Sequence, residues 1–421
     1  MHKNPLLHMV AAAAAILSPV LVLTMKGGAG YCYFTVFTLS LVSLSHADYR
    51  QRAAQLYRAH RLFVWGMLTM PCIVLFQILV LRTGTFPELD PLLRLALVPV
   101  SFFFLCSLPS RQLRRVQWGF VAGALAVGLW AAYARAYIPT WAAPARLGNS
   151  FTNPIPFGDT ALLLGFLALT SIERDARPTV FEVLIKFAAA FAGLYASYVS
   201  GSRGGWIAIP LLVWVAASRR RWLVSVRARI AFGCVLVASA AAFASTSLVR
   251  ERIEAIGSDV QQMNEGNLDT SMGLRLDLWR ASAKLYLHHP LIGVGRGSLE
   301  ASLRTLADKG EAPRAIVNGR AHSEFFSALA ETGTLGVAAL LLLYIGTILP
   351  FWRARRSDDP DIATAANMGV GLVGGTILFG LTIDVLTLVM NAAFFALSAA
   401  TLLGWIEARK RELADGGGLA P

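Results

Sequence analysis

The chain has 421 residues, of which 56% are hydrophobic and only 15% are charged. This composition, with a mean hydropathy of +0.56, lies outside the usual range of soluble domains and excludes a cytosolic enzyme. The 38 Lys and Arg residues exceed the 25 Asp and Glu residues, which gives a formal net charge of +13. Nucleic-acid binding would also use such a surplus, so the placement of the basic residues has to be examined.

Long apolar runs predict membrane-spanning helices. Runs such as residues 62–81 and 230–249 match the roughly 20 residues that a helix needs to cross a bilayer. They lack the alternation of barrel strands, so we expect an all-α, polytopic membrane protein with about twelve spans. In chain order the predicted spans are 5–25, 30–45, 62–81, 92–108, 117–137, 159–172, 179–199, 205–217, 230–249, 323–351, 362–382 and 385–405.

Basic residues are distributed unequally between alternate connecting segments. With the N-terminus inside, the inside segments hold 21 Lys and Arg residues, whereas the short outside loops hold four: Lys26, Arg82, Arg146 and Arg203. This asymmetry predicts that both termini are cytoplasmic. The basic surplus is therefore mainly topogenic, and we expect no nucleic-acid partner.

One connecting segment is much longer than the others. We expect residues 1–249 to hold the first nine spans, residues 250–322 to form a helical loop on the outer side, and residues 323–421 to hold three spans and a cytoplasmic tail. Apolar residues recur at helical spacing over 253–263 and 274–285, and Ser298 is a candidate N-cap for a further helix.

Arg203 is the first candidate site residue. It lies in Ser200-Gly201-Ser202-Arg203-Gly204-Gly205-Trp206, at the outer end of the seventh predicted span. Glycine-flanked backbone can approach a ligand closely, and a cation at the membrane boundary favours an anionic one. The alternative is an interfacial arginine whose head reaches lipid headgroups.

Arg275 and His322 are the other two candidates. Arg275 lies one helical turn from Trp279, and the alternative is a surface arginine paired with Asp277 or another carboxylate. His322 lies where the outer loop returns to the membrane, and a neutral histidine there could accept a proton from a hydroxyl group. The alternative for His322 is a helix cap. The pair His288-His289 is more simply a helix end before Pro290.

The predicted outer segments contain no metal-binding motif. They lack HExxH, paired aspartates and a tight His/Asp/Glu cluster, so we expect no metal and no other cofactor. The glycine-rich stretch at 293–297 lacks the full phosphate-loop pattern and is interpreted as a turn.

Together these motifs resemble the O-antigen ligase and polymerase superfamily. The resemblance rests on Ser202-Arg203-Gly204-Gly205, Arg275 with Trp279, the stretch from His289 to Gly295, His322-Ser323-Glu324 and the stretch from Glu331 to Gly336. Asn149-Ser150-Phe151-Thr152-Asn153-Pro154 is a less specific feature. Ser323 departs from the family, where Asn is more frequent after the histidine.

The resemblance implies a GT-C-like membrane glycosyltransferase of the bacterial inner membrane with a periplasmic active site. It implies transfer of a glycan from undecaprenyl diphosphate to a hydroxyl group of an acceptor. The single dominant outer loop, with no second loop of comparable size, favours the ligase that joins O-antigen to lipid A-core oligosaccharide. Arg203 and Arg275 would then bind the diphosphate, because guanidinium groups bind phosphate bidentately, and His322 would act as the base. A single displacement would invert the anomeric carbon.

Three other functions remain open at this point. An O-antigen polymerase and a protein O-oligosaccharyltransferase share these residue types and differ in the acceptor. A transporter of lipid-linked glycan also needs many spans, but it predicts charged or broken helices near the bilayer midplane. Arg203, Arg275 and His322 all map instead to the outer boundary.

Overall fold

The fold is known from a computed structural model that describes residues 5–137, 146–172, 178–218 and 271–416. In these ranges every regular element is a helix, apart from one isolated bridge between Asn149 and Thr152. This confirms the predicted all-α class. Within these described ranges, seven helices are long and apolar enough to cross a membrane. A helix satisfies its own backbone hydrogen bonds, which is the requirement that lipid imposes.

Eleven of the twelve predicted spans lie in the described ranges, and each coincides with a helix; residues 230–249 lie outside them. The bundle helices are α1 (Pro5–Thr24), α2 (Gly28–Ser43), α4 (Arg61–Phe76) continued by the π-helical η1 (Gln77–Leu81), α5 (Leu89–Leu105), α6 (Ser110–Arg114), α7 (Val116–Tyr137), α8 (Pro154–Thr170), α9 (Val180–Val199), η3 (Gly204–Ala208), α10 (Ile209–Ala217), α15 (Glu324–Ala354), α16 (Pro360–Phe379) and α17 (Val389–Gly416).

Two predicted boundaries were wrong. The predicted spans 362–382 and 385–405 leave almost no connection, but α16 ends at Phe379 and α17 begins at Val389. Residues 380–388 form a turn whose polar groups bond to α15, as described below. The segment 47–59, predicted only as a basic connection, is the amphipathic helix α3 (Ala47–Ala59).

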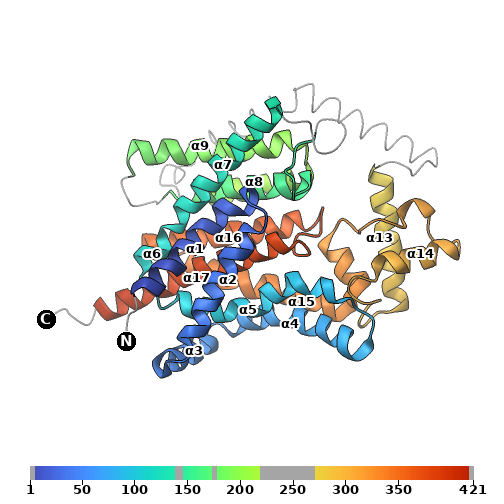
Figure 1. The fold of residues 1–421 in the computed structure, drawn as a ribbon, viewed down its shortest axis with the longest axis horizontal. Coiled ribbons are helices and arrows are strands. Elements are labelled where there is room, and N and C mark those ends of the chain that lie inside the picture. The colour runs from blue at the N-terminus through green and yellow to red at the C-terminus, as the bar shows by residue number, and fades with distance from the viewer. Residues whose placement is uncertain (1–4, 138–145, 173–177, 219–270, 417–421) are drawn as a thin grey trace.

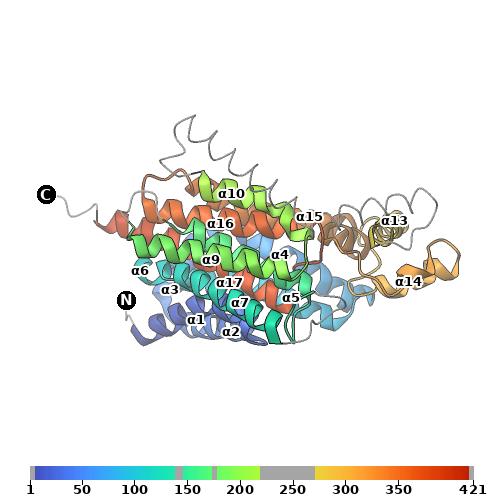
Figure 2. The ribbon, with the colours of Figure 1, turned by 90° about the horizontal axis from the view of Figure 1, so that it is seen from above.

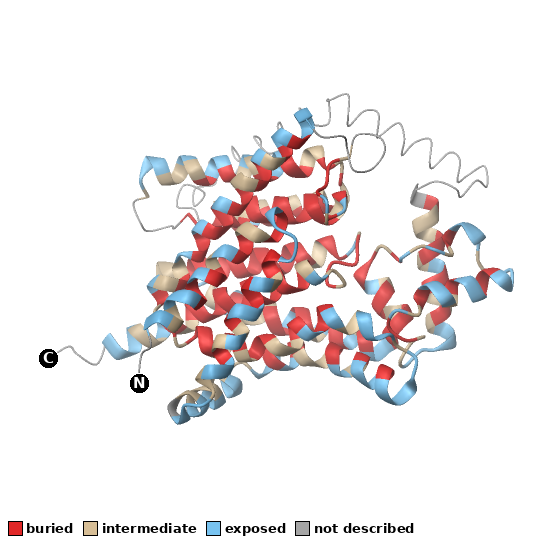
Figure 3. Cartoon of the chain, in the orientation of Figure 1, coloured by how far each residue is buried: buried red, intermediate tan, exposed pale blue. Residues whose placement is uncertain are grey.

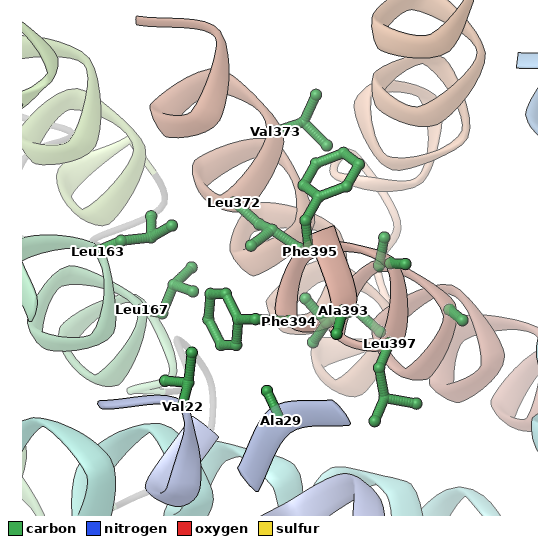
Figure 4. Packing of buried hydrophobic residues seen from close by; sticks show 14 of the residues in the cluster. Val22, Ala29, Leu163, Leu167, Leu372, Val373, Ala393, Phe394, Phe395 and Leu397 are labelled. Atoms are coloured by element: carbon green, nitrogen blue, oxygen red, sulfur yellow. The ribbon is translucent and has the colours of Figure 1, made fainter. Parts of the chain in front are cut away.

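Helices α16 and α17 form the centre of the bundle. In each of these helices, 89% of the most apolar 18-residue stretch is buried. The corresponding share is 28% in α9, which lies at the edge. Figure 3 shows this gradient from the buried centre to the exposed outer faces. Phe394 and Phe395 of α17 project among Leu163 and Leu167 of α8 and Leu372 of α16 (Figure 4). Such close side-chain packing holds membrane helices together.

A second, smaller layer lies beyond one end of the bundle. It contains α13 (Ser271–His288) and α14 (Leu299–Asp308), and Figures 1 and 2 show it at the end opposite to the start of α1. Leu278, Leu285 and Leu303 form its own small core. The predicted helices over 274–285 and after Ser298 are confirmed, whereas the pattern at 253–263 lies outside the described residues. Ser298 precedes α14, but its side chain makes no cap bond, because its hydroxyl donates to the Thr83 carbonyl at 2.7 Å.

Candidate functional site

The glycine-rich stretch 293–297 is a docking turn, as predicted. Its partner is the break in α15 at Gly333, whose φ of 62° and ψ of −157° are not helical. At this break the amide of Thr334 donates to the Pro290 carbonyl at 2.8 Å, and the amide of Gly295 donates to the Glu331 carbonyl at 2.9 Å. A Cβ on Gly333 would lie 2.6 Å from the Leu291 carbonyl carbon. Two of the motifs in the resemblance therefore bind each other.

Arg296 secures this junction from inside. It is 3% exposed, and its Nη1 atom lies 3.1 Å from Glu331 Oε2. Gln77, at the end of α4, donates to the carbonyls of Ile292 and Glu331 at 2.6 and 2.9 Å and accepts from the Arg296 amide at 3.2 Å. Burial opposes the charge of Arg296, but neighbouring carboxylates outweigh burial and raise its pKa. These contacts fix the outer layer on the bundle.

Trp279 of α13 holds the turn that carries His322. Its indole N–H donates to the Ala321 carbonyl at 2.9 Å, and its ring stacks on Phe326 with the centroids 5.0 Å apart. His322 lies between these two contacts and has a φ of 49°, in the left-handed region that non-glycine residues rarely adopt. Such backbone persists where its surroundings impose it, and this is common at functional sites.

Arg275 lies one turn before Trp279 on α13, and its charge acts on His322. The side chain is half-buried, and within the described residues it forms no ion pair or hydrogen bond. The alternative pairing with Asp277 is wrong, because Asp277 Oδ1 lies 3.5 Å from Arg280 Nη1 instead. Burial lowers the pKa of Arg275. A guanidinium group nevertheless stays charged at neutral pH.

The turn 380–388 connects His322 to the bundle. Ser327 donates to Asp384 Oδ1 at 2.5 Å, and Glu324 Oε2 accepts from the Leu386 amide at 2.9 Å. The Glu324 amide donates to the Gly380 carbonyl at 2.8 Å. Each end of the turn is thus bonded to the first two helical turns of α15. These bonds were not predicted, because residues 381–389 are mostly apolar and most of them were assigned to two predicted spans.

Arg203 lies close to the same turn. It immediately precedes η3, and a Cβ on the next residue, Gly204, would lie 2.6 Å from Thr382 Oγ1. Ser202 donates to Asp159 Oδ1 of α8 at 3.3 Å. Arg203 and His322 therefore both lie near residues 380–388, whereas Arg275 acts on His322 from the outer layer.

A cavity of about 750 Å³ opens at His322. Its lining combines the basic residues Lys26, Arg94 and Arg320 with Asp384 and His322, and its other walls are largely apolar, including Tyr31, Phe34, Ile383, Leu388, Val389 and Met390. Of the three predicted site residues, His322 lines this cavity, and neither Arg203 nor Arg275 is among its described lining residues. The cavity is complementary to an amphipathic anion, because cations line one part of its wall and apolar side chains line another.

Sequence reasoning missed Arg94. It lies on α5 near the start of the helix, is 7% exposed, and has its Nη1 atom 2.7 Å from Asp90 Oδ1. Its Nε atom has no hydrogen-bond partner among the described residues. An arginine within a predicted span was the available signal, because intramembrane charges are rare and commonly functional.

The surroundings of His322 favour its neutral form. Partial burial lowers the pKa of the imidazole, and the positive charges of Arg275 and Arg320 lower it further, while Asp384 acts in the opposite direction. The result is an imidazole that carries a free lone pair at neutral pH, next to cations that are suited to an anionic substrate.

The less specific motif has a structural explanation. Asn149 donates to the Leu23 carbonyl at 2.8 Å, and Asn153 accepts from the Ile155 amide as the N-cap of α8. Asn153 also lines the cavity. His288 and His289 are exposed at the end of α13, as predicted. In the described ranges no three His, Cys, Asp or Glu side chains converge as a metal site would require.

The fold is that of a helical membrane protein, and a cavity with basic and apolar lining residues lies at one end of its bundle. Residues 188–341 match the family model described as O-antigen ligase, a range that contains Arg203, Arg275 and His322. This match confirms the resemblance and supports membership of the O-antigen ligase family. It also supports a ligase-type or polymerase-type function in lipopolysaccharide biosynthesis.

A relative from Haemophilus influenzae (strain ATCC 51907 / DSM 11121 / KW20 / Rd) carries the description "Uncharacterized protein". It is 23% identical over 228 residues, which cover 52% of this chain and 56% of that protein. The chain thus spans about half the length of this relative.

Proposed function

We propose that this protein is an O-antigen ligase. It transfers O-antigen polysaccharide from undecaprenyl diphosphate to a sugar hydroxyl of lipid A-core oligosaccharide, on the periplasmic face of a bacterial inner membrane. The observation that carries the proposal is the cavity at His322, where cations, an imidazole with a lowered pKa and an apolar wall meet. A polyprenyl diphosphate combines the two matching chemistries, a dianionic group and a long hydrocarbon.

The reaction is a single displacement. The acceptor hydroxyl oxygen attacks the anomeric carbon, the bond from that carbon to the diphosphate oxygen breaks, and its electron pair leaves with undecaprenyl diphosphate. His322 takes the proton of the hydroxyl as the new bond forms. Attack from the face opposite the leaving group inverts the anomeric configuration.

Arg203 and Arg275 stabilise the leaving group in this proposal. Negative charge accumulates on the diphosphate as the glycosidic bond breaks, and fixed guanidinium groups stabilise that charge without titrating. Lys26, Arg94 and Arg320 are the basic lining residues of the cavity itself. The Arg94 side chain is also held in place by a cation–π contact, because its guanidinium carbon lies 5.2 Å from the centre of the Phe34 ring.

A product assay tests the proposal and separates it from the alternatives. Purified protein is incubated with undecaprenyl-diphosphate-linked glycan and lipid A-core, and both lipids are resolved by gel electrophoresis. The ligase produces lipid A-core of higher mass. Lengthening of glycan on the carrier, with lipid A-core unchanged, would identify a polymerase. Glycosylation only of an added acceptor protein would identify an O-oligosaccharyltransferase. If no glycosidic bond formed in any of these reactions, the result would favour a transporter of lipid-linked glycan.

A further inference from the structure

A second cavity lies at the end of the bundle opposite to His322. Its volume is about 870 Å³, and its walls come from the junction of α3 and α4, the last turns of α15, the start of α16 and residues 403–410 of α17. The only carboxylate among its described lining residues is Glu407. The basic lining residues are Arg58, His60, Arg61, Arg353, Arg356 and Lys410.

Glu407 already has partners. Its Oε1 atom lies 2.8 Å from Lys410 Nζ and 3.4 Å from His60 Nε2. Within the described residues, the four arginines form no ion pair or hydrogen bond, and all four are exposed: Arg58, Arg61, Arg353 and Arg356. The cavity thus gathers four guanidinium groups whose charge no side chain in it balances.

The wall between these arginines is preformed by close helix packing. A Cβ on Gly346 of α15 would lie 2.2 Å from the Leu62 carbonyl oxygen, and one on Gly66 of α4 would lie 2.8 Å from the Leu342 carbonyl oxygen. Glycine at both positions lets the two backbones touch. Arg61 at the start of α4 and Arg353 near the end of α15 are therefore held across one cavity.

Hydrocarbon surface continues from the arginines along the bundle. Leu62, Leu349 and Pro350 line the cavity. Further along the same two helices, Trp65 of α4 is 50% exposed and Ile345 of α15 is 53% exposed. A free anion would not contact this apolar surface, whereas a lipid could pack its acyl chains against it and place its headgroup among the arginines.

We propose that this cavity binds the phosphate of an anionic phospholipid headgroup, with the acyl chains along α4 and α15. Guanidinium groups match phosphate oxygens in charge and geometry, and basic pockets between membrane helices are suited to such headgroups. Basic residues also set topology at this end of the bundle. Topology requires only their number, however, and does not require that they converge on one cavity. The site is separate from His322 and does not depend on the proposed transfer reaction.

The test is a lipid titration of the full-length protein, purified in detergent, stripped of lipid and followed by native mass spectrometry. Phosphatidylglycerol, phosphatidylcholine and inorganic phosphate are titrated separately. One variant is Arg353→Gln with Arg356→Gln, and a second is Arg58→Gln with Arg61→Gln. The matched control is Arg111→Gln with Arg115→Gln. These two arginines are also exposed and lie at the same end, where the Ser110 amide donates to Glu412 of α17 at 2.8 Å.

We expect phosphatidylglycerol to bind more tightly than phosphatidylcholine. Each cavity variant should lose roughly tenfold or more in affinity for phosphatidylglycerol, and the control should lose much less. Equal losses in all three variants would mean general attraction to this surface and would overturn the site. Equal affinity for the two lipids would overturn the anionic headgroup. Binding of inorganic phosphate that matches the lipid in affinity would show that the acyl chains contribute nothing.

Discussion

Trp279→Phe and Trp279→Ala test whether α13 positions His322. Phenylalanine keeps a ring to stack on Phe326 but loses the 2.9 Å bond to the Ala321 carbonyl, whose net value is about 1 kcal/mol. Alanine also loses the stacked contact, worth roughly 1 kcal/mol more. If this energy holds His322 in its unusual backbone conformation, kcat should fall by about fivefold in the first variant and by about thirtyfold in the second.

The assay is the glycan transfer reaction at saturating donor and acceptor, which separates kcat from KM. Trp214 provides the matched control, because it stacks on Trp352 with centroids 6.1 Å apart, away from the His322 turn. Trp214→Phe should keep the kcat of the unmodified protein. Unchanged kcat in both Trp279 variants, with unchanged elution from a sizing column, would refute the positioning argument.

Three further predictions follow from the site. Arg203→Lys and Arg275→Lys should each impair transfer although the charge is kept, because lysine lacks the bidentate fork; full turnover in both variants would contradict their assignment to the diphosphate. The apparent pKa of the acid limb of the kcat/KM profile should lie below the ordinary histidine pKa. Burial and Arg275 lower the pKa of His322, and the base works only when it is unprotonated. Arg275→Gln should move this limb to higher pH and Asp384→Asn should move it to lower pH; a limb that stays in place in both variants would exclude His322 as the titrating group. Excess chelator should leave turnover of the purified protein unchanged, and a loss that added divalent ions restore would show that the reaction needs a metal.

The sequence predicted the helices well because membrane spans are encoded locally. Each apolar run must satisfy its own backbone, so residues such as 5–25 and 179–199 identify helices without any knowledge of their neighbours. The turn 380–388 was missed for the same reason. Its composition is apolar, and its departure from helix depends on bonds to Glu324 and Ser327, which lie more than fifty residues away.

The candidate site was predicted only in part. His322 and Arg275 were identified from their motifs, and the structure brings them together through Trp279. Arg94 and Asp384 were missed because their role depends on which helices are neighbours in space. Glu331 and Gly333 were recognised only as motif members. These two residues form the helix break at which the 290–297 turn docks, and this contact is visible only in the three-dimensional structure.

In the proposed mechanism, His322 is the base of a glycan transfer reaction. The most direct measurement compares the initial rate of lipid A-core modification by the unmodified protein, by His322→Ala and by the control variant His289→Ala, whose side chain is exposed at the end of α13. We expect full activity in the control and a loss of at least about a hundredfold in His322→Ala, the usual contribution of a general base. Near-normal transfer by His322→Ala would contradict this mechanism.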